Sequence, residues 1–366
     1  SINNPQTVYF SKSGDYENMD ANIGGTVADD DAIIYTIASN QVNAIRFLTS
    51  ARTLIIGTAG GEFVVSGGGD NNAVTPTNIM IKKQSNHGAA NVDAISVGNA
   101  TLFLQRAKRK IRELAYNFDV DGYIAPDLTI LAEHITEGNV VEMAYQEEPL
   151  AIIWCVRGDG QLIALTYQRE QEVVAWHRHI IGGVFGTGNA VVESVAVIPT
   201  EDSEYELYVV VKRTINNITR RYVEYLHTFN FTETDNTSFN YLDSQLSLSK
   251  LQTTLTAGIN AAVTTVPVAS VSGLSTAGKI KIGGEIIAYT GISTLNLTGC
   301  TRGQNSTTAV AHLSGAVTKE VVNTISGLNH LEGQTVSILA DGATHPTKVV
   351  DANGAITLDR FATDVK

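Results

Sequence analysis

Two short segments combine residue types that bind metal ions in other proteins. His177 and His179 are separated by one residue, so both imidazoles would lie on one face of a regular strand. Such a pair can begin a metal site, but no third ligand is suggested, and we expect packing or a polar sheet face instead. Residues 117–122, NFDVDG, contain an Asp-x-Asp-Gly core. An EF-hand loop needs a Glu at its twelfth position, where this chain has Leu128. A weak surface calcium site remains an alternative.

Two further features invite a chemical interpretation and favour a structural one. Arg157-Gly158-Asp159 spells a cell-adhesion tripeptide, but it lies between two strong strand patterns, where Gly and Asp are ordinary turn residues. Cys155 and Cys300 are far apart in the sequence and fit neither a metal spacing nor a disulfide framework. We expect both cysteines to be small buried apolar residues.

The densest basic run is Arg106–Arg112, RAKRKIR. Between two predicted strands it should form an exposed, solvated turn. In a ring of subunits it could instead meet an acidic patch of a neighbour, such as Glu147-Glu148, or touch DNA. If it meets such a patch, charge reversal at Lys108, Arg109 and Lys110 should impair ring assembly.

No motif of catalysis or cofactor binding is visible along the chain. We find no nucleophile elbow, no phosphate-binding loop and no zinc spacing. Acidic residues are plentiful, but nothing selects a carboxylate pair of the kind that cleaves glycosidic bonds. The sequence therefore predicts a protein that is not an enzyme, with no catalytic, cofactor-binding or metal-binding residues and no cofactor.

Composition indicates an all-β protein. The 366 residues include 32 Gly and only 7 Pro, and stretches with helical periodicity are almost absent. The formal net charge of −12 argues against an ordinary nucleic-acid-binding surface, although an acidic wall could let DNA pass without holding it. No apolar run approaches the roughly 20 residues of a membrane span, so we expect no membrane anchor. No secretory signal is visible, and the start in mid-pattern without Met suggests a fragment of a longer chain.

A meander of short strands recurs along the first two thirds of the chain. In residues 150–183, apolar strands are predicted at 152–156, 162–167 and 173–177, with a turn at 157–160. The second strands of four such units are marked by Leu54, Leu102, Ile152 and Leu207, at intervals of 48, 50 and 55 residues. Antiparallel units of about 40–50 residues are typical of propeller blades. A β-sandwich of long strands is the competing architecture.

The flanking segments complete the predicted organisation. A strand is expected at 7–10, and residues 32–37 fit a strand or a short helix. Residues 1–250 would form the blades, with 228–250 as a polar excursion. Residues 251–319, rich in Thr, Ala, Gly and Val, would form an inserted small β module. Residues 320–366 return to β-hairpins.

Five stretches of this chain resemble the tail tubular protein B, or tail nozzle, family of short-tailed bacteriophages and their prophage relatives. They are residues 5–19, 54–67, 75–135, 145–179 and 326–342. The resemblance implies a β-propeller subunit, of which six copies form the lower tube of the tail below an adaptor ring. It also implies a central channel through which the genome leaves, and further sequence on both sides of this chain.

The inserted module carries a second resemblance. Residues 265–274, 280–291 and 297–312 resemble a small β-barrel of phage structural proteins, similar to the first catalytic cysteine half-domain of ubiquitin-activating enzymes. Cys300 lies in this module but has no activating base nearby in sequence, so we expect no thioester chemistry.

These observations predict a structural virion protein. It would be a β-propeller fragment with an inserted small β-barrel, acting as a subunit of a homohexameric tail nozzle. Its partners would be other copies of itself, the tail adaptor protein, a tail fibre or spike protein, and passing DNA without specific binding. It would be assembled in the bacterial host cytoplasm and reside in the virion. The alternative is a glycan-binding or glycan-cleaving propeller at the tail tip.

Overall fold

The chain is all-β, as predicted from its composition. The structure, a computed structural model, describes residues 3–38, 43–51, 53–68, 73–201, 204–227, 234–235, 237–240 and 244–366. The predicted polar excursion at 228–250 lies partly outside these residues. By their contacts the residues form two compact units. Unit 1 comprises residues 1–181, 187–212 and 221–226, and unit 2 comprises 182–186, 213–220 and 227–366. No helix among the described residues is long and apolar enough to cross a membrane.

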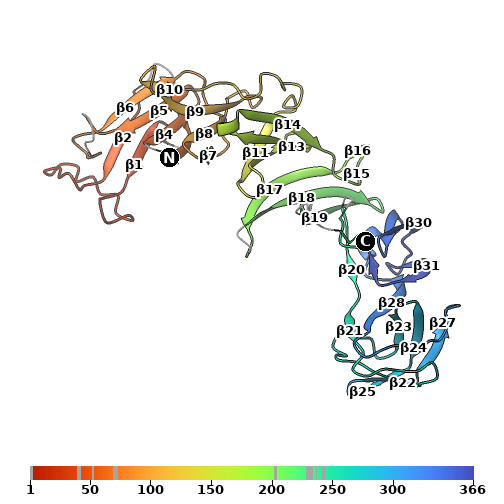
Figure 1. The fold of residues 1–366 in the computed structure, drawn as a ribbon. Helices are drawn as coiled ribbons and strands as arrows, with labels where there is room; N and C mark the ends of the chain where they lie inside the picture. Colours follow the sequence, from red (N-terminus) through yellow and green to blue (C-terminus); the bar gives the residue numbers. More distant parts are fainter. Residues whose placement is uncertain are drawn as a thin grey trace. The chain divides into compact units, whose positions relative to one another are not determined.

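Unit 1 contains three antiparallel meanders and most of a fourth, which we call sheets I to IV (Figure 1). Sheet I comprises β3 (Ile45–Ser50), β4 (Leu54–Thr58), β5 (Gly61–Ser66) and β6 (Met80–Ser85). Sheet II comprises β7 (Ile95–Val97), β8 (Ala100–Leu104), β9 (Ile111–Asn117) and β10 (Gly122–Ile124). Sheet III comprises β11 (Val140–Gln146), β12 (Ile152–Arg157), β13 (Leu162–Gln168) and β14 (Val173–His179). Sheet IV comprises β17 (Val191–Pro199), β18 (Tyr205–Ile215) and β19 (Ile218–Tyr225).

The four marker residues lie on the second strand of their sheets, so the predicted repeat of the meander is confirmed. Leu54 begins β4, Leu102 lies in β8, Ile152 begins β12 and Leu207 lies in β18. The strands predicted at 152–156, 162–167 and 173–177 are confirmed as β12, β13 and β14, and β11 precedes them as a fourth strand.

Each sheet packs on the next through a separate hydrophobic core. Ile55 and Phe103 belong to the core between sheets I and II. Leu102 and Cys155 belong to the core between sheets II and III. Trp154 joins the core between sheets III and IV. Adjacent residues of one strand therefore bury on opposite faces. This explains why the middle strands are apolar at nearly every position instead of alternating.

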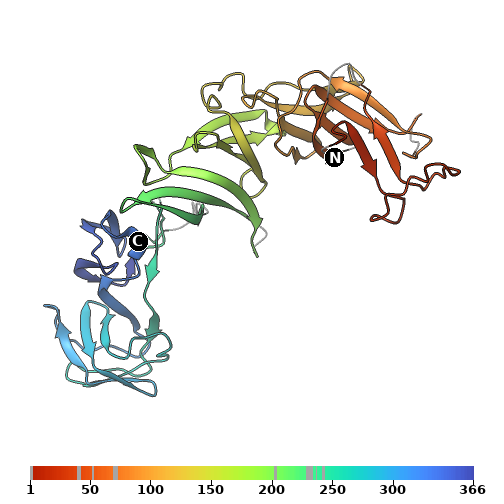
Figure 2. The ribbon, with the colours of Figure 1, turned by 180° about the vertical axis from the view of Figure 1, so that it is seen from behind.

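A shorter ladder precedes sheet I. β1 (Thr7–Phe10) pairs antiparallel with β2 (Ile33–Thr36), which settles residues 32–37 as strand rather than helix. Val8 and Ile37 pack against Ile56, Phe63 and Val65 of sheet I. Figure 2, from behind, again shows the strands of this unit following one another in chain order from red to green.

Unit 2 is built from three sheets. A six-stranded sheet contains β21 (Gln252–Thr254), β23 (Gly278–Ile282), β24 (Glu285–Tyr289), β27 (Thr301–Gln304), β28 (Val317–Ile325) and β31 (Ile356–Ala362). A three-stranded sheet contains β22 (Thr265–Pro267), β25 (Gly291–Ser293) and β26 (Asn296–Thr298). A four-stranded sheet contains β20 (Leu248–Ser249), β29 (Thr335–Ala340), β30 (Ala343–Val349) and β32 (Asp364–Val365). The chain also has two short strands outside these sheets, β15 (Val184–Phe185) and β16 (Gly188–Asn189).

The inserted module differs from the closed barrel expected from the sequence. Among the described residues its ladders form two sheets around one core, and no ladder joins them into a cylinder. The two sheets are joined by a short contact, the isolated bridge between Leu255 and Val268. β28 reaches beyond the module: its first half pairs with β21 and β23, and its second half pairs with β31 of the C-terminal segment. The sheet therefore continues out of the module, and position 319 falls inside one strand.

Candidate functional site

Corresponding strands of neighbouring sheets run in the same direction. The turns of sheets I to IV therefore lie at two opposite ends of the series of sheets. At one end, the Val140 N–H donates to the Lys108 carbonyl at 2.8 Å and the Val192 N–H to the Gly160 carbonyl at 2.8 Å. These contacts join turns between second and third strands to the start of the following sheet. We call this the crossover end. Arg106 Nη1 donates there to the Ala59 carbonyl at 3.4 Å, which joins sheets I and II.

The opposite end carries the turns between first and second strands and between third and fourth strands. There the Tyr205 N–H donates to the Glu148 carbonyl at 3.1 Å, and Arg169 Nη1 donates to Asn99 Oδ1 at 2.6 Å. Thr53 and Tyr123 share a hydrogen bond of 2.9 Å at this end of sheets I and II. Each pair of neighbouring sheets is therefore tied at both ends.

This second end is strongly acidic. The described turns there carry eight carboxylates, on Asp119, Asp121, Glu147, Glu148, Glu170, Glu172, Glu201 and Glu204. Arg169 is the one cation in the same described turns, and it pairs with Glu113 at 2.6 Å. We call this the acidic end. Its carboxylates come from three sheets, so the charge gathers only because the sheets share one orientation.

The basic run lies at the crossover end, and its cations divide into two groups. Lys110 Nζ is 2.9 Å from Asp127 and 3.0 Å from Glu133, and Arg112 donates to Gln105 and to the Ala125 carbonyl. Hydrogen bonds to these carboxylates raise the pKa of Lys110. Lys108 and Arg109 make no ion pair with a described residue. The solvated turn predicted from the sequence therefore holds for its tip, whereas the end of the run belongs to the fold.

The metal-ion candidates remain isolated from further ligands. His177 Nδ1 lies 2.7 Å from His179 Nε2, and His177 Nε2 lies 3.0 Å from Thr166 Oγ1. Burial lowers the pKa of His177. Both rings stack at the edge of the Trp154 indole. No group of three or more His, Cys, Asp or Glu side chains in the described part of the chain could hold a metal ion.

The predicted turn residues act as turn residues. Asn117 Oδ1 accepts from the Asp119 and Val120 N–H groups, which closes the β9–β10 turn on itself. The guanidinium of Arg157 bonds Asp159, Gln161 Oε1 at 2.9 Å and the Ile135 carbonyl at 2.8 Å, so it is folded onto the protein. Gly160 follows with a φ of 85°, in the left-handed region that glycine adopts readily.

Both cysteines are buried, as predicted. Cys155 is 0% exposed between sheets II and III, and Cys300 is 6% exposed in the core of the inserted module. Burial raises the pKa of each thiol, which keeps both protonated and unreactive.

The inserted module contains a buried ion cluster that the sequence did not reveal. Glu285, 1% exposed, accepts hydrogen bonds from Arg302 Nε at 2.8 Å and Nη2 at 2.7 Å, and its Oε2 lies 2.8 Å from His312 Nε2. Burial by itself would raise the pKa of Glu285, but these bonds and two backbone N–H groups lower it to about 2. Arg302 meets Glu285 when β24 pairs with β27, and His312 is placed by its bridge to Ile259, so no local sequence signal marks the cluster.

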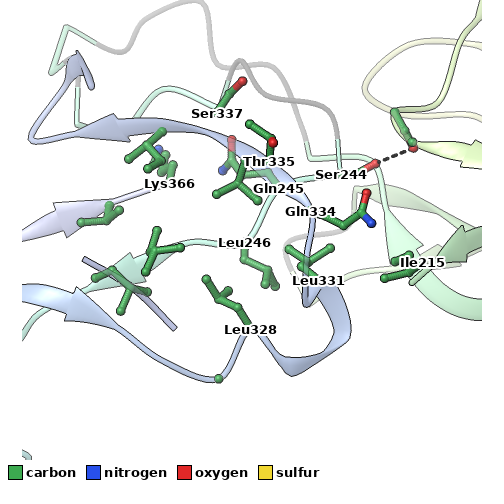
Figure 3. A pocket seen from close by; sticks show the side chains of 18 of the residues that line it. Ile215, Ser244, Gln245, Leu246, Leu328, Leu331, Gln334, Thr335, Ser337 and Lys366 are labelled. Carbon is green, nitrogen blue, oxygen red and sulfur yellow. Dashed lines mark hydrogen bonds between the residues drawn. The ribbon is translucent and has the colours of Figure 1, made fainter. Parts of the chain in front are cut away.

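Unit 2 also contains a pocket of about 620 Å³ that no motif predicted (Figure 3). Leu246 comes to it from one segment of the chain, and Leu328 and Leu331 come from another. Arg213, 5% exposed, donates to the Gly182 carbonyl at 2.7 Å and to Ser244 Oγ at 2.5 Å. The described lining of the pocket includes no carboxylate and no aromatic ring. Ser244 therefore has no carboxylate base beside it among these residues, as a nucleophile would need. The described lining also offers no aromatic ring on which a sugar could stack.

Comparison with known proteins adds little. No protein-family model matches the chain, and no curated protein matches it. Among solved structures, it is similar to an auxiliary nutrient binding protein from Bacteroides thetaiotaomicron, with a TM-score of 0.30 and 8% sequence identity. That alignment covers 54% of this chain and 49% of the other, so this chain spans about half the length of that structure.

Proposed function

We propose that this chain is a structural virion protein, a subunit of the tubular tail nozzle of a short-tailed phage. Its work is geometric: it forms part of a stiff wall around the channel through which DNA is ejected. Six copies would form the ring, which would contact the tail adaptor protein and a fibre or spike protein. The protein would be assembled in the bacterial host cytoplasm and remain in the virion.

The observation that carries this proposal is the series of like-oriented sheets in unit 1. Consecutive meanders that pack face to face and meet at both ends have the arrangement of neighbouring propeller blades, so we include the partial propeller in the proposal. Sheets I to III bury apolar residues on both faces, which makes the series rigid. A rigid series with polar turns at its ends suits a wall that must keep its shape while other subunits attach to the turns.

The acidic end supports the same proposal. A surface whose described turns carry eight carboxylates and one already paired cation repels phosphate, so DNA would slide past it instead of binding. The stretches that resemble the tail nozzle family also run through sheets I to III, which are three of the four sheets of the series. The glycan-cleaving alternative gains no support from the pocket of unit 2, whose described lining offers neither carboxylates nor aromatic rings.

Negative-stain microscopy of the full-length protein mixed with its adaptor tests the proposal. We expect closed rings of six copies seated on the adaptor. A matched sample in which Glu147 and Glu148 are both changed to Lys should still form the sheets but should retain added double-stranded DNA. If no condition gives rings with the adaptor, the proposal is wrong.

A further inference from the structure

The pocket of unit 2 has a firm apolar floor. Leu328, Ile338 and Ile356 line it and belong at the same time to the hydrophobic core of the C-terminal segment. Leu331 packs against this core and is only partly buried. Because these contacts hold the floor in place, the volume of about 620 Å³ is a feature of the fold. Small-molecule sites in proteins have volumes of about 300–1,000 Å³, so the pocket is large enough for a ligand.

The wall of the pocket is aliphatic. Eleven of its 24 described lining residues are Val, Ile or Leu, and none of the 24 is aromatic. Figure 3 shows Leu246 and Leu331 between Lys366 and Ile215, so apolar side chains form the middle of the pocket. The Leu246 side chain is 51% exposed and leaves apolar surface that a ligand could cover. Such a wall suits a flexible hydrocarbon chain better than a flat ring, which aromatic side chains would hold by stacking.

The charged groups in the described lining are both cations, Arg213 and Lys366. Hydrogen bonds hold Arg213 in the wall. Lys366 has a fixed position, because its backbone N–H and C=O both bond to Leu339 at 2.8 Å. Its Nζ donates to the Phe239 carbonyl and makes no ion pair with a described residue. Burial lowers the pKa of Lys366, and an anion beside the ammonium group would compensate for the hydration that it has lost.

We propose that this pocket binds an aliphatic chain that ends in an anionic group, as a fatty acid does. The hydrocarbon would lie on Leu246 and Leu331, and the anion would meet the ammonium group of Lys366. Burial of the hydrocarbon supplies affinity, and the charged contact fixes the orientation of the ligand. Free fatty acids and anionic membrane lipids share this chemistry, and the experiment separates the two sources. The inference concerns unit 2 alone and stands whether or not the chain belongs to a tail nozzle.

Isothermal titration calorimetry of the full chain tests the proposal with three probes of increasing length, octanoate, decanoate and dodecanoate. Each is used below its critical micelle concentration. We expect a Kd below about 1 mM for dodecanoate and an affinity that rises about fourfold with each added CH₂ group. Dodecyltrimethylammonium has a chain of the same length and the opposite charge. It should bind at least about tenfold more weakly than dodecanoate, because it cannot pair with a cation.

Leu246→Asp places a carboxylate on the apolar wall, and Leu295→Asp is its matched control. Leu295 is 45% exposed, lies in the inserted module of the same unit and does not line the pocket. Leu246→Asp should weaken dodecanoate binding about tenfold or more, and Leu295→Asp should leave it unchanged. Lys366→Met should weaken binding about tenfold, whereas Lys348→Met, which removes a partner of Asp359 outside the pocket, should not. Unchanged circular dichroism shows that each variant is folded.

Binding that strengthens with chain length and is weakened by Leu246→Asp but not by Leu295→Asp supports the site. Sedimentation of the chain with phosphatidylglycerol vesicles would then identify a membrane lipid as the source, and dodecanoate binding without such sedimentation would identify a free fatty acid. Absence of dodecanoate binding up to about 1 mM, or equal binding by both Asp variants, overturns the inference. Equal affinity for dodecanoate and dodecyltrimethylammonium also overturns it, because the anion would then play no part.

Discussion

Arg302→Met tests whether the buried ion cluster holds the inserted module together. The guanidinium of Arg302 makes two hydrogen bonds to Glu285, which has almost no contact with solvent. Removing one partner of a buried ion pair costs about 3–5 kcal/mol, because the remaining charge is left uncompensated. His312 and two backbone N–H groups still bond Glu285, so we expect the lower end of this range. A loss of about 3 kcal/mol corresponds to roughly 150-fold easier opening of β24.

Native-state hydrogen exchange of β24, followed by mass spectrometry, measures this opening directly. Both tryptophans, Trp154 and Trp176, lie in unit 1, so their fluorescence gives an internal control in the same sample. We expect the tryptophan transition of Arg302→Met to stay at its wild-type position while β24 exchanges faster. Arg221→Met removes an exposed partner of Glu193 in unit 1 and should leave the exchange of β24 unchanged.

Acid titration of the wild-type protein gives a second measure of how much the same cluster contributes to the free energy of unfolding. Glu285 has a folded pKa of about 2, whereas a glutamate in an unfolded chain titrates near about 4.3. A lowered carboxylate pKa stabilises the fold at pH values above the unfolded pKa. That contribution, up to about 3 kcal/mol, is therefore complete above about pH 5 and is lost as the pH falls toward about 2. The comparison uses protection factors, because the intrinsic rate of amide exchange itself depends on pH. Protection of β24 that does not change over this pH range, or wild-type protection in Arg302→Met, would refute the reasoning.

Three further outcomes are expected. The double variant Lys108→Glu/Arg109→Glu should impair ring assembly in native gels while unit 1 stays folded. Lys110→Glu should instead lower the thermal stability of unit 1, because Lys110 bridges Asp127 and Glu133. Replacing residues 255–316 by Asn-Gly should leave a folded, soluble chain by circular dichroism, because β21 and β28 already pair antiparallel up to the cut and a two-residue turn can join them. Cys155 should resist thiol reagents in the native protein and react after denaturation, as mass spectrometry of the modified chain would show.

Strand positions were predictable where both local turn chemistry and an apolar run were present. Gly160 and the adjacent Asn216 and Asn217 take positive φ values at hairpin turns, which short-range preferences favour. The strands between these turns were found because most of their positions are apolar. The fourth strands of sheets I and II, β6 and β10, were harder to predict. They lie at sheet edges, are partly exposed and mix polar with apolar residues, so they show no clear hydrophobic periodicity.

The candidate sites depend on which strands pair with each other. The partner of a strand can lie far along the chain, so the residues near a site do not reveal it. His177 and His179 were assigned to packing because no third ligand follows in sequence, and the described structure adds none. The pocket of unit 2 and the cluster around Glu285 gave no signal, because each gathers residues from separate strands. Likewise, no sequence signal shows that β28 continues out of the inserted module and pairs with β31, because that partner lies more than 30 residues further along the chain.

The sequence by itself determined the all-β class, the recurring meander and the burial of both cysteines, because turn residues and apolar runs act over a few neighbouring positions. Only the tertiary structure decided that sheets I to IV share one orientation. That orientation sends the carboxylates of three sheets to one end and the tip of the basic run to the other. These features come from hydrogen bonds between residues such as Tyr205 and Glu148, whose meeting depends on how whole sheets pack.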